Sequence, residues 1–330
     1  MKHRLLLTFD VEDFINPQSI KALSLLLTLL KKYKINALFF ITGHMAERLC
    51  FFEEVMRSLE EHELGFHSSA HSVHPTIFEY CDVERYEDAY ELSLERETSH
   101  INPLSGRVEG KGGIRTLKDL FSSKNVSAYR ALGYCCPPPH LEAMASLGIK
   151  FDFSWSLSKT AVNYKGITFY PRPFFLDCEN ALLEDKSKIA NWVMLMRSVF
   201  MREMTVLNFH PHSLVEKDHW DSIYHRCNPP ELDRALPRDS RETQRMLTKL
   251  EALLKIVRRL EEFGVIDTSP YLTRSKVDLD TAKLDIDRLA DDYSFWPKTF
   301  FGYEPRHIYS QLSNIFELDI EVTNRSCSPL

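Results

Sequence analysis

Two histidines in one short segment are the residues of this chain best suited to chemistry. His67 and His71 are four positions apart, and on one helical turn both imidazoles face the same way, so both can bind one cation. An acidic group, Asp10, Glu12 and Asp13, follows the first apolar run. Two imidazoles and one carboxylate are a common ligand set for catalytic zinc. The sequence therefore predicts a divalent metal site.

The carboxylate ligand is either Glu12 or Asp13. Glu12 lies two residues after Asp10, so on an extended strand both side chains point to one side. Asp13 reaches the metal only if the chain turns after Val11. We rank Glu12 slightly ahead and keep both. His74 is a rival ligand, because its three-residue offset from His71 is also usable on a helix.

The elements that position these residues alternate along the chain. Apolar runs predict strands at residues 4–10, 36–42, 64–67, 126–132, 149–155, 167–175 and 204–209. Helices are expected at residues 17–30, 43–61, 83–99, 141–147 and 182–200, with a helical turn over 67–71 and a last helix opened by an Asp239–Glu242 capping box. This order predicts a parallel sheet, open or closed into a barrel.

The candidate residues fall at the ends of the predicted strands. Asp10, His67, Arg130 and His210 each lie at or just after such an end. In parallel α/β folds the carboxyl ends of the strands are where active sites form. A glycine-rich stretch at residues 105–113 lacks the Gly-Lys-Ser/Thr ending of a phosphate-binding loop, so we expect a mobile loop there.

Composition narrows the classes of function. The chain has 330 residues, 44% of them hydrophobic, and a formal charge of −6, which suits a full α/β core and disfavours a nucleic-acid surface. No apolar run approaches the roughly 20 residues of a membrane span. Seven scattered cysteines without a Cys-x-x-Cys pair fit reduced thiols, and no export signal is visible. We expect a cytoplasmic protein.

With these residues assembled, the chain resembles the polysaccharide deacetylase family, also called the NodB-homology or carbohydrate esterase 4 family, over about residues 4–268. The family's Thr-Phe-Asp is found at residues 8–10, and the Asp-Val-Glu-Asp form of residues 10–13 is similar to a branch associated with surface-polysaccharide gene clusters. Its His-Ser/Thr-x-x-His motif matches residues 67–71. Its arginine motif falls at Arg130, with Leu132 in place of proline, and its apolar strand ends in His210.

The resemblance implies a distorted (β/α) barrel of about seven strands over residues 1–269. The aromatic residues 270–330 then form a C-terminal cap or a contact between copies in a homo-oligomer. The implied metal is zinc, with Co, Ni, Mn or Fe as alternatives.

The resemblance also implies an activity, the metal-assisted hydrolysis of an N-acetyl group on an amino sugar. In that mechanism Asp10 is the general base and His210 protonates the departing amine, while Arg130 keeps Asp10 ionised. Oxyanion stabilisation by a backbone N–H near Tyr134 is also expected. The expected substrate contacts are Tyr134, Trp155 and His212.

Three classes of function stay open. The first is an N-deacetylase acting on a cytoplasmic precursor of a surface glycan, such as a sugar nucleotide or a lipid-linked sugar. The second is a metal amidohydrolase of the same fold that cleaves a small non-sugar amide, ureide or formamide. The third is a non-catalytic relative that keeps the fold as a binding module. The joint presence of Asp10, His67, His71 and His210 favours an enzyme.

Overall fold

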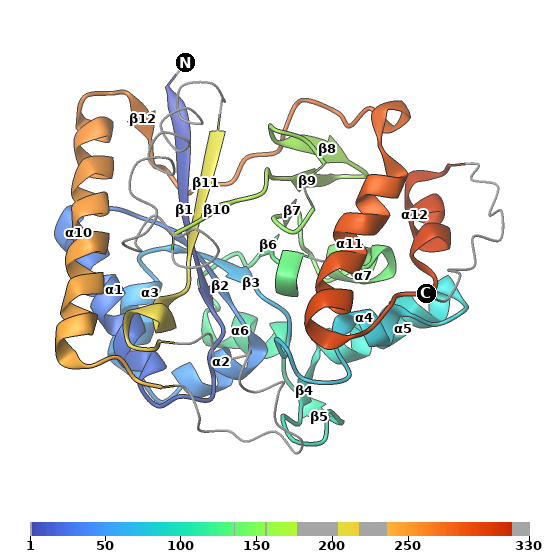
Figure 1. The fold of residues 1–330 in the computed structure, drawn as a ribbon, viewed down its shortest axis with the longest axis horizontal. Helices are drawn as coiled ribbons and strands as arrows, with labels where there is room; N and C mark the ends of the chain where they lie inside the picture. Colours follow the sequence, from blue (N-terminus) through green and yellow to red (C-terminus); the bar gives the residue numbers. More distant parts are fainter. Residues whose placement is uncertain (1, 135, 156, 177–203, 218–235, 319–330) are drawn as a thin grey trace.

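One curled sheet forms the centre of the structure, a computed structural model that describes residues 2–134, 136–155, 157–176, 204–217 and 236–318 (Figure 1). Nine strands follow the order β10-β11-β1-β2-β3-β6-β7-β9-β8, and β12 pairs with β1. Their bounds are β1 His3–Val11, β2 Leu38–Ile41, β3 Glu63–Phe66, β6 Ala128–Tyr129, β7 Phe151–Asp152, β8 Val162–Tyr164, β9 Ile167–Phe169, β10 Phe174–Phe175, β11 Met204–Phe209 and β12 Ile266–Asp267. Every pair is parallel except β8 with β9.

The predicted α/β class and barrel-like architecture are confirmed. β1 is central, pairing with β11 along residues 4–9 and with β2 along residues 8–11. Because the neighbouring strands run parallel, the carboxyl ends of β11, β1, β3 and β6 meet at one edge of the sheet. The described residues leave the curl open between β10 and β8. The short strands β8, β10 and β12 raise the strand number above the predicted seven.

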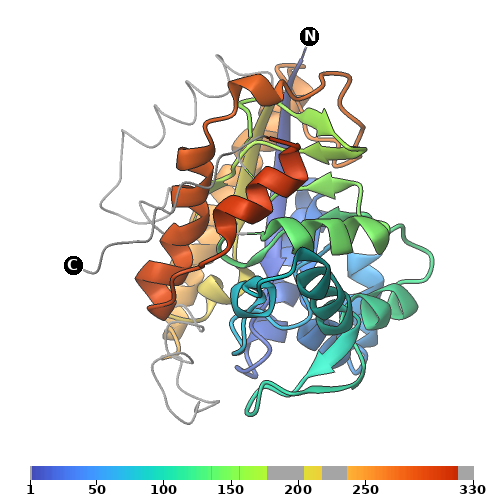
Figure 2. The same ribbon diagram turned by 90° about the vertical axis from the view of Figure 1, so that its right-hand side faces the viewer.

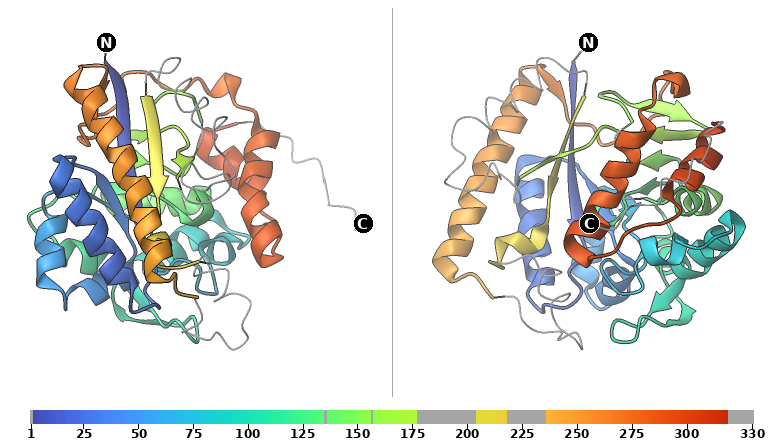
Figure 3. Two further views of the ribbon diagram at one scale, coloured as in Figure 1. Left: turned by 60° about the vertical axis from the view of Figure 1, so that its left-hand side comes forward. Right: turned by 45° about the vertical axis from the view of Figure 1, so that its right-hand side comes forward.

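Helices cover the sheet on both sides (Figures 1 and 3). Their bounds are α1 Ser19–Tyr33, α2 Gly43–Leu49, α3 Glu53–Leu59, α4 Ile77–Cys81, α5 Tyr86–Glu97, α6 Ile114–Leu120, α7 Pro138–Ser146, α10 Ser240–Glu262, α11 Ile286–Phe301 and α12 Ile308–Phe316, with short 3-10 turns η1 Leu132–Tyr134, η2 Pro211–Leu214 and η3 Thr281–Lys283. α1 buries the apolar face read from its sequence, including Leu23, Leu27 and Leu30. α10 begins at the predicted capping box, in which Asp239 and Glu242 each accept the other's backbone N–H.

Four local predictions were wrong. The strand expected over residues 167–175 is two strands, β9 and β10, which do not pair with each other. The helix expected over residues 43–61 is two helices, α2 and α3, because the chain leaves the helix between them at residues 50–52. The segment from His67 to His71 is not helical, and Ser68 takes the left-handed φ of 69°. The glycine-rich stretch is largely a hairpin of β4 (Ser99–Ile101) and β5 (Val108–Lys111). The helix expected over residues 182–200 lies outside the described residues.

The C-terminal helices α11 and α12 pack against the rest of the fold on the side of α4, α5 and α7 (Figure 2). The buried carboxylate of Asp82 ties them down: it accepts the Tyr303 hydroxyl and the backbone N–H groups of Arg306 and His307 at 2.9 and 3.0 Å. The packing of α11 and α12 agrees with the cap that the aromatic composition of residues 270–330 predicts. The domain boundary at residue 269 stays a prediction. Among the described helices, none has the length and apolarity needed to cross a membrane.

Candidate active site

The predicted metal ligands meet at the carboxyl edge of the sheet. Glu12 follows β1, His67 follows β3, and His71 lies in the loop beyond it. One oxygen, Glu12 Oε2, is 3.0 Å from His67 Nε2 and 3.2 Å from His71 Nε2. All three side chains are buried, at 1–5% exposure. Three donor atoms that converge in this way are the arrangement a divalent cation requires.

Backbone contacts fix the ring of His67 for metal binding. His67 Nδ1 lies 2.7 Å from the carbonyl oxygen of Arg130, which can only accept a hydrogen bond. Nδ1 therefore carries the proton, and Nε2 turns its lone pair toward Glu12 and His71. His71 Nδ1 contacts the Ser72 hydroxyl at 2.7 Å, which leaves its Nε2 on the same side. The donor set of two imidazole nitrogens and one carboxylate oxygen fits zinc.

The other candidates, Asp13 and His74, lie outside this group. Asp13 accepts the backbone N–H groups of Ile15 and Asn16 at 3.0 and 3.1 Å and the Ser19 hydroxyl, so it holds the turn that leads into α1. His74 is half exposed and contacts Glu79 at 2.9 Å. The structure thus brings together Glu12, His67 and His71.

Asp10 lies beside the metal-ligand group and is held on both of its oxygens. Arg130 Nη1 donates to Oδ1 at 2.6 Å, Asn208 Nδ2 donates to Oδ2 at 2.7 Å, and His210 Nε2 is 3.6 Å from Oδ2. Burial raises the pKa of the Asp10 carboxyl, but the charge of Arg130, followed by those of His67 and His210, outweighs burial and leaves this pKa below its ordinary value. Asp10 is therefore held as an anion beside Glu12, His67 and His71.

Arg130 is wholly buried, and its guanidinium contacts Asp10 and residues around Asp10. Its guanidinium also donates to Asn208 Oδ1 at 2.8 Å and to the Thr8 hydroxyl at 3.0 Å, and it lies 4.1 Å from the centroid of the Phe40 ring. Asn208 was missed by sequence reasoning. Its signal was a single amide in the otherwise apolar run of β11, two residues before His210.

Residues 1–110 match the family model described as polysaccharide deacetylase. This third of the chain is similar to the polysaccharide deacetylase family. It contains Asp10, Glu12, His67 and His71, four of the residues on which the resemblance read from the sequence rests. No curated protein matches the chain significantly.

Three solved structures are similar to this chain at low sequence identity. A protein from Mycobacterium smegmatis assigned as a polysaccharide deacetylase is 14% identical, with 84% of this chain and 96% of that chain covered and a TM-score of 0.46. A protein from Bordetella bronchiseptica assigned as a polysaccharide deacetylase of O-antigen biosynthesis is 14% identical, with 76% of this chain and 91% of that chain covered and a TM-score of 0.40. Puue allantoinase is 12% identical, with 90% of each chain covered and a TM-score of 0.47. At these values the likenesses do not extend any of these activities to this chain.

The three expected substrate contacts, Tyr134, Trp155 and His212, lie in different places. Trp155 and Tyr134 both line one cavity at the rim of the sheet. The Tyr134 hydroxyl accepts from Asn208 Nδ2 at 3.1 Å, while its backbone N–H already donates to Ala131 O at 3.1 Å. His212 is only 2% exposed and packs 5.6 Å from the ring of His210, so it lies behind that imidazole.

A buried ion pair stabilises the loop that carries His67 and His71. Glu97, at the end of α5, accepts the Ser69 N–H at 2.6 Å and the Ser68 hydroxyl at 2.8 Å. Its partner Arg96 donates to the Ser68 hydroxyl at 2.6 Å and to Ala70 O at 2.7 Å. Both charged side chains are fully buried. They stabilise the left-handed Ser68, and sequence reasoning missed them because α5 reads as a polar surface helix.

Proposed function

We propose that the chain is a metal-dependent hydrolase that removes an N-acyl group from an amino sugar. The observation that carries this proposal is the convergence of Glu12, His67 and His71 beside the paired Asp10 and His210. The family match of residues 1–110 supports sugar de-N-acylation as the reaction class. We further propose a cytoplasmic precursor of a surface glycan as substrate. The free cysteines Cys50, Cys81 and Cys136 support a reducing compartment.

Glu12, His67 and His71 would hold the metal. The chemistry supplied by a divalent cation at these residues would be the acidification of a water molecule and the polarisation of the amide carbonyl. The chain supplies the proton transfers. Asp10, kept ionised by Arg130, accepts a proton from the attacking water.

His210 then donates a proton to the departing amine, which is a poor leaving group while it is unprotonated. Its position suits this role, because His210 Nε2 is 3.6 Å from Asp10 Oδ2 and its ring is parallel to that of Phe175, with the centroids 6.1 Å apart. Phe175 thus limits the orientations that the imidazole can take. Base and acid are held side by side, as one hydrolytic cycle requires.

Elemental analysis of purified variants tests the metal site. We expect His67→Ala, His71→Ala and Glu12→Gln to lose bound zinc, because each removes one of three converging ligands. His74→Ala is the matched control: a histidine of the same segment, half exposed and outside the ligand group, which should keep its metal. Full occupancy in the double His67→Ala, His71→Ala protein would end the proposal.

Acetate release tests the reaction. The metal-loaded protein is incubated with N-acetylated sugar nucleotides, N-acetylated oligosaccharides and small non-sugar amides and ureides. Turnover on the sugars supports the proposal. Turnover confined to the non-sugar amides assigns the chain to the amidohydrolase class, and a metal-loaded protein that hydrolyses none of them is a binding relative.

A further inference from the structure

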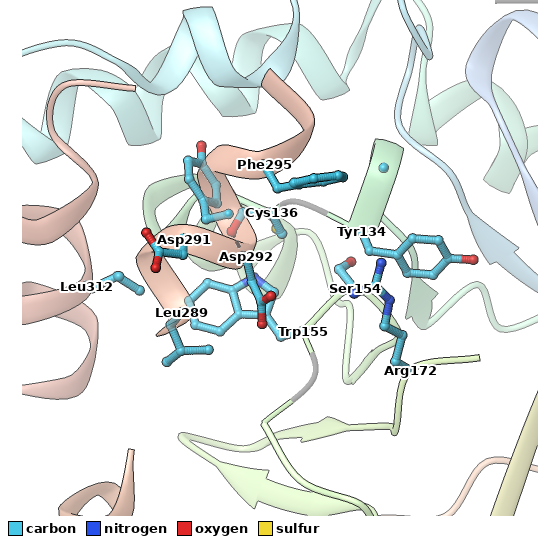
Figure 4. A pocket seen from close by; sticks show the side chains of 12 residues that line it. Tyr134, Cys136, Ser154, Trp155, Arg172, Leu289, Asp291, Asp292, Phe295 and Leu312 are labelled. Atoms are coloured by element: carbon cyan, nitrogen blue, oxygen red, sulfur yellow. Dashed lines mark hydrogen bonds between the residues drawn. The ribbon is translucent and has the colours of Figure 1, made fainter. Parts of the chain in front are cut away.

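A cavity of about 450 Å³ lies between the rim of the sheet and the C-terminal helices (Figure 4). Its inner wall comes from η1, from Cys136 ahead of α7 and from the segment after β7, and its outer wall comes from α11 and α12. The outer wall lies far beyond residues 1–110, the segment that matches the family model. A volume of this size is in the range of small-ligand sites.

The inner part of the cavity is apolar and rigid. Trp155 is 7% exposed, and its Nε1 donates to Cys136 O at 2.8 Å, which fixes the plane of the indole. Leu312 and Tyr293 are buried beside it. Phe295 stands at the mouth with 54% of its surface exposed. A fixed indole within and an exposed phenyl ring at the mouth offer flat apolar faces to a ring-shaped ligand.

The mouth carries charge of both signs. Asp291 and Asp292 of α11 line the cavity, and Arg172 lies at the other end, next to Tyr134 (Figure 4). Two carboxylates outnumber one guanidinium in the lining, and Arg288, which lies 3.7 Å from the Asp292 carboxylate, offsets part of this negative charge. A diphosphate placed here would meet carboxylates of its own sign. Carboxylates do accept hydrogen bonds from hydroxyl groups, and an arginine can donate to them.

Tyr134 connects the cavity to the candidate active site. One side of Tyr134 lines the cavity, and its hydroxyl points away from it, toward Asn208, which also holds Asp10 (Figure 4). Its ring packs edge-on against Phe175 at 5.3 Å, and Phe175 in turn stacks on His210. A ligand in the cavity is thus separated from the catalytic groups by a single aromatic side chain.

We propose that this cavity binds a neutral, hydroxyl-rich glycosyl ring that is joined to the N-acylated sugar. The proposal rests on the proposed function and narrows it: the substrate carries at least one further sugar next to the one that loses its acyl group. The apolar face of that ring stacks on Trp155 and Phe295, and its hydroxyls reach Asp291, Asp292 and Arg172. A nucleoside diphosphate joined directly to the N-acylated sugar does not match this lining.

Binding measurements by calorimetry test the cavity without requiring turnover. The probes are N-acetylglucosamine, di-N-acetylchitobiose and UDP-N-acetylglucosamine, each titrated into the wild-type protein and into Phe295→Ala and Asp291→Asn. We expect the disaccharide to bind the wild type about tenfold more tightly than the monosaccharide, the order of one aromatic stacking contact. Both variants should lose most of that gain and leave monosaccharide binding unchanged. Phe263→Ala, which removes an 81% exposed phenyl ring at the end of α10, is the matched control and should behave as wild type.

Two results would overturn the proposal. One is UDP-N-acetylglucosamine binding more tightly than the disaccharide and losing affinity in Phe295→Ala, because the cavity would then hold the nucleoside. The other is disaccharide affinity that equals monosaccharide affinity, or that ignores both substitutions. Ring-dependent binding without any acetate release would contradict the proposed function alone and leave the cavity assignment standing.

Discussion

Replacing Glu97 with Gln tests whether α5 holds the loop that carries His67 and His71. The substitution keeps the size of the side chain and removes its charge. The Ser69 N–H and the Ser68 hydroxyl then share a weaker acceptor, and the buried Arg96 loses its counter-charge. Breaking a buried ion pair from one side costs about 3–5 kcal/mol of the free energy of unfolding.

The same substitution should weaken metal binding. Loss of groups that orient metal ligands typically costs about 10–100-fold in metal affinity. Here His67 and His71 flank the Ser68–Ala70 backbone that Glu97 and Arg96 hold. Gly43 adds to this packing, since a Cβ on it would lie 2.7 Å from Gly113 Cα and 2.8 Å from Ser69 O. A loosened loop would therefore let the two imidazoles separate.

Urea unfolding followed by circular dichroism gives the stability change, and competition with a chromophoric chelator gives the zinc affinity. Glu53→Gln is the matched control, because the same exchange there breaks only an exposed pair with Arg57 and should cost under about 1 kcal/mol. A Glu97→Gln protein within 1 kcal/mol of wild type would refute the energetic argument. Lost stability with unchanged zinc affinity would refute the positioning role.

Three further predictions concern separate parts of the molecule. Burial lowers the pKa of His62 to about 4, so between pH 6.5 and 4 the unfolded chain binds a proton that the folded chain does not bind. The free energy of unfolding of wild type, measured by urea unfolding, should therefore fall relative to that of His62→Gln by about 1.4 kcal/mol per pH unit as the pH is lowered through this range. Asp82→Ala leaves a hydroxyl and two backbone N–H groups without their acceptor, so amide hydrogen exchange should rise in α11 and α12 and stay unchanged in β1 and β2. Asp10→Asn should keep its metal and lose about 10²–10⁴-fold in turnover; loss of metal instead would make Asp10 a ligand.

The sheet and the strand ends could be predicted because their signals are local. Continuous apolar runs mark β1, β2 and β11, and the polar residue that ends a run marks the carboxyl edge, as at Asp10 and His210. The capping box of α10 is equally local, since its two side chains are three residues apart. These features need no knowledge of the distant parts of the chain.

The path between the two histidines could not be predicted, because distant residues determine it. A four-residue spacing suggests a helical turn, yet Ser68 adopts a left-handed conformation that Glu97 and Arg96 stabilise from about thirty residues further along the chain. Asn208 and Arg130 share a hydrogen bond across the sheet that no local pattern reveals. The strand β8 has too few residues for a periodic signal, and the apolar run of residues 167–175 does not reveal that it is divided between β9 and β10.

The docking of the C-terminal helices by Asp82 bears on how this chain can change in evolution. Two of the four donors to Asp82 are backbone N–H groups, which nearly every amino-acid sequence supplies, and the other two, the Tyr303 hydroxyl and Arg306 Nε, lie beyond the end of α11. The anchor therefore places little constraint on the side chains of α11, among them those that line the cavity. The residues of the candidate active site lie at strand ends elsewhere in the chain. Substitutions on α11 could therefore change which ligand the cavity binds, while the groups proposed for hydrolysis keep their places. Such variation would change the ligand more readily than the reaction.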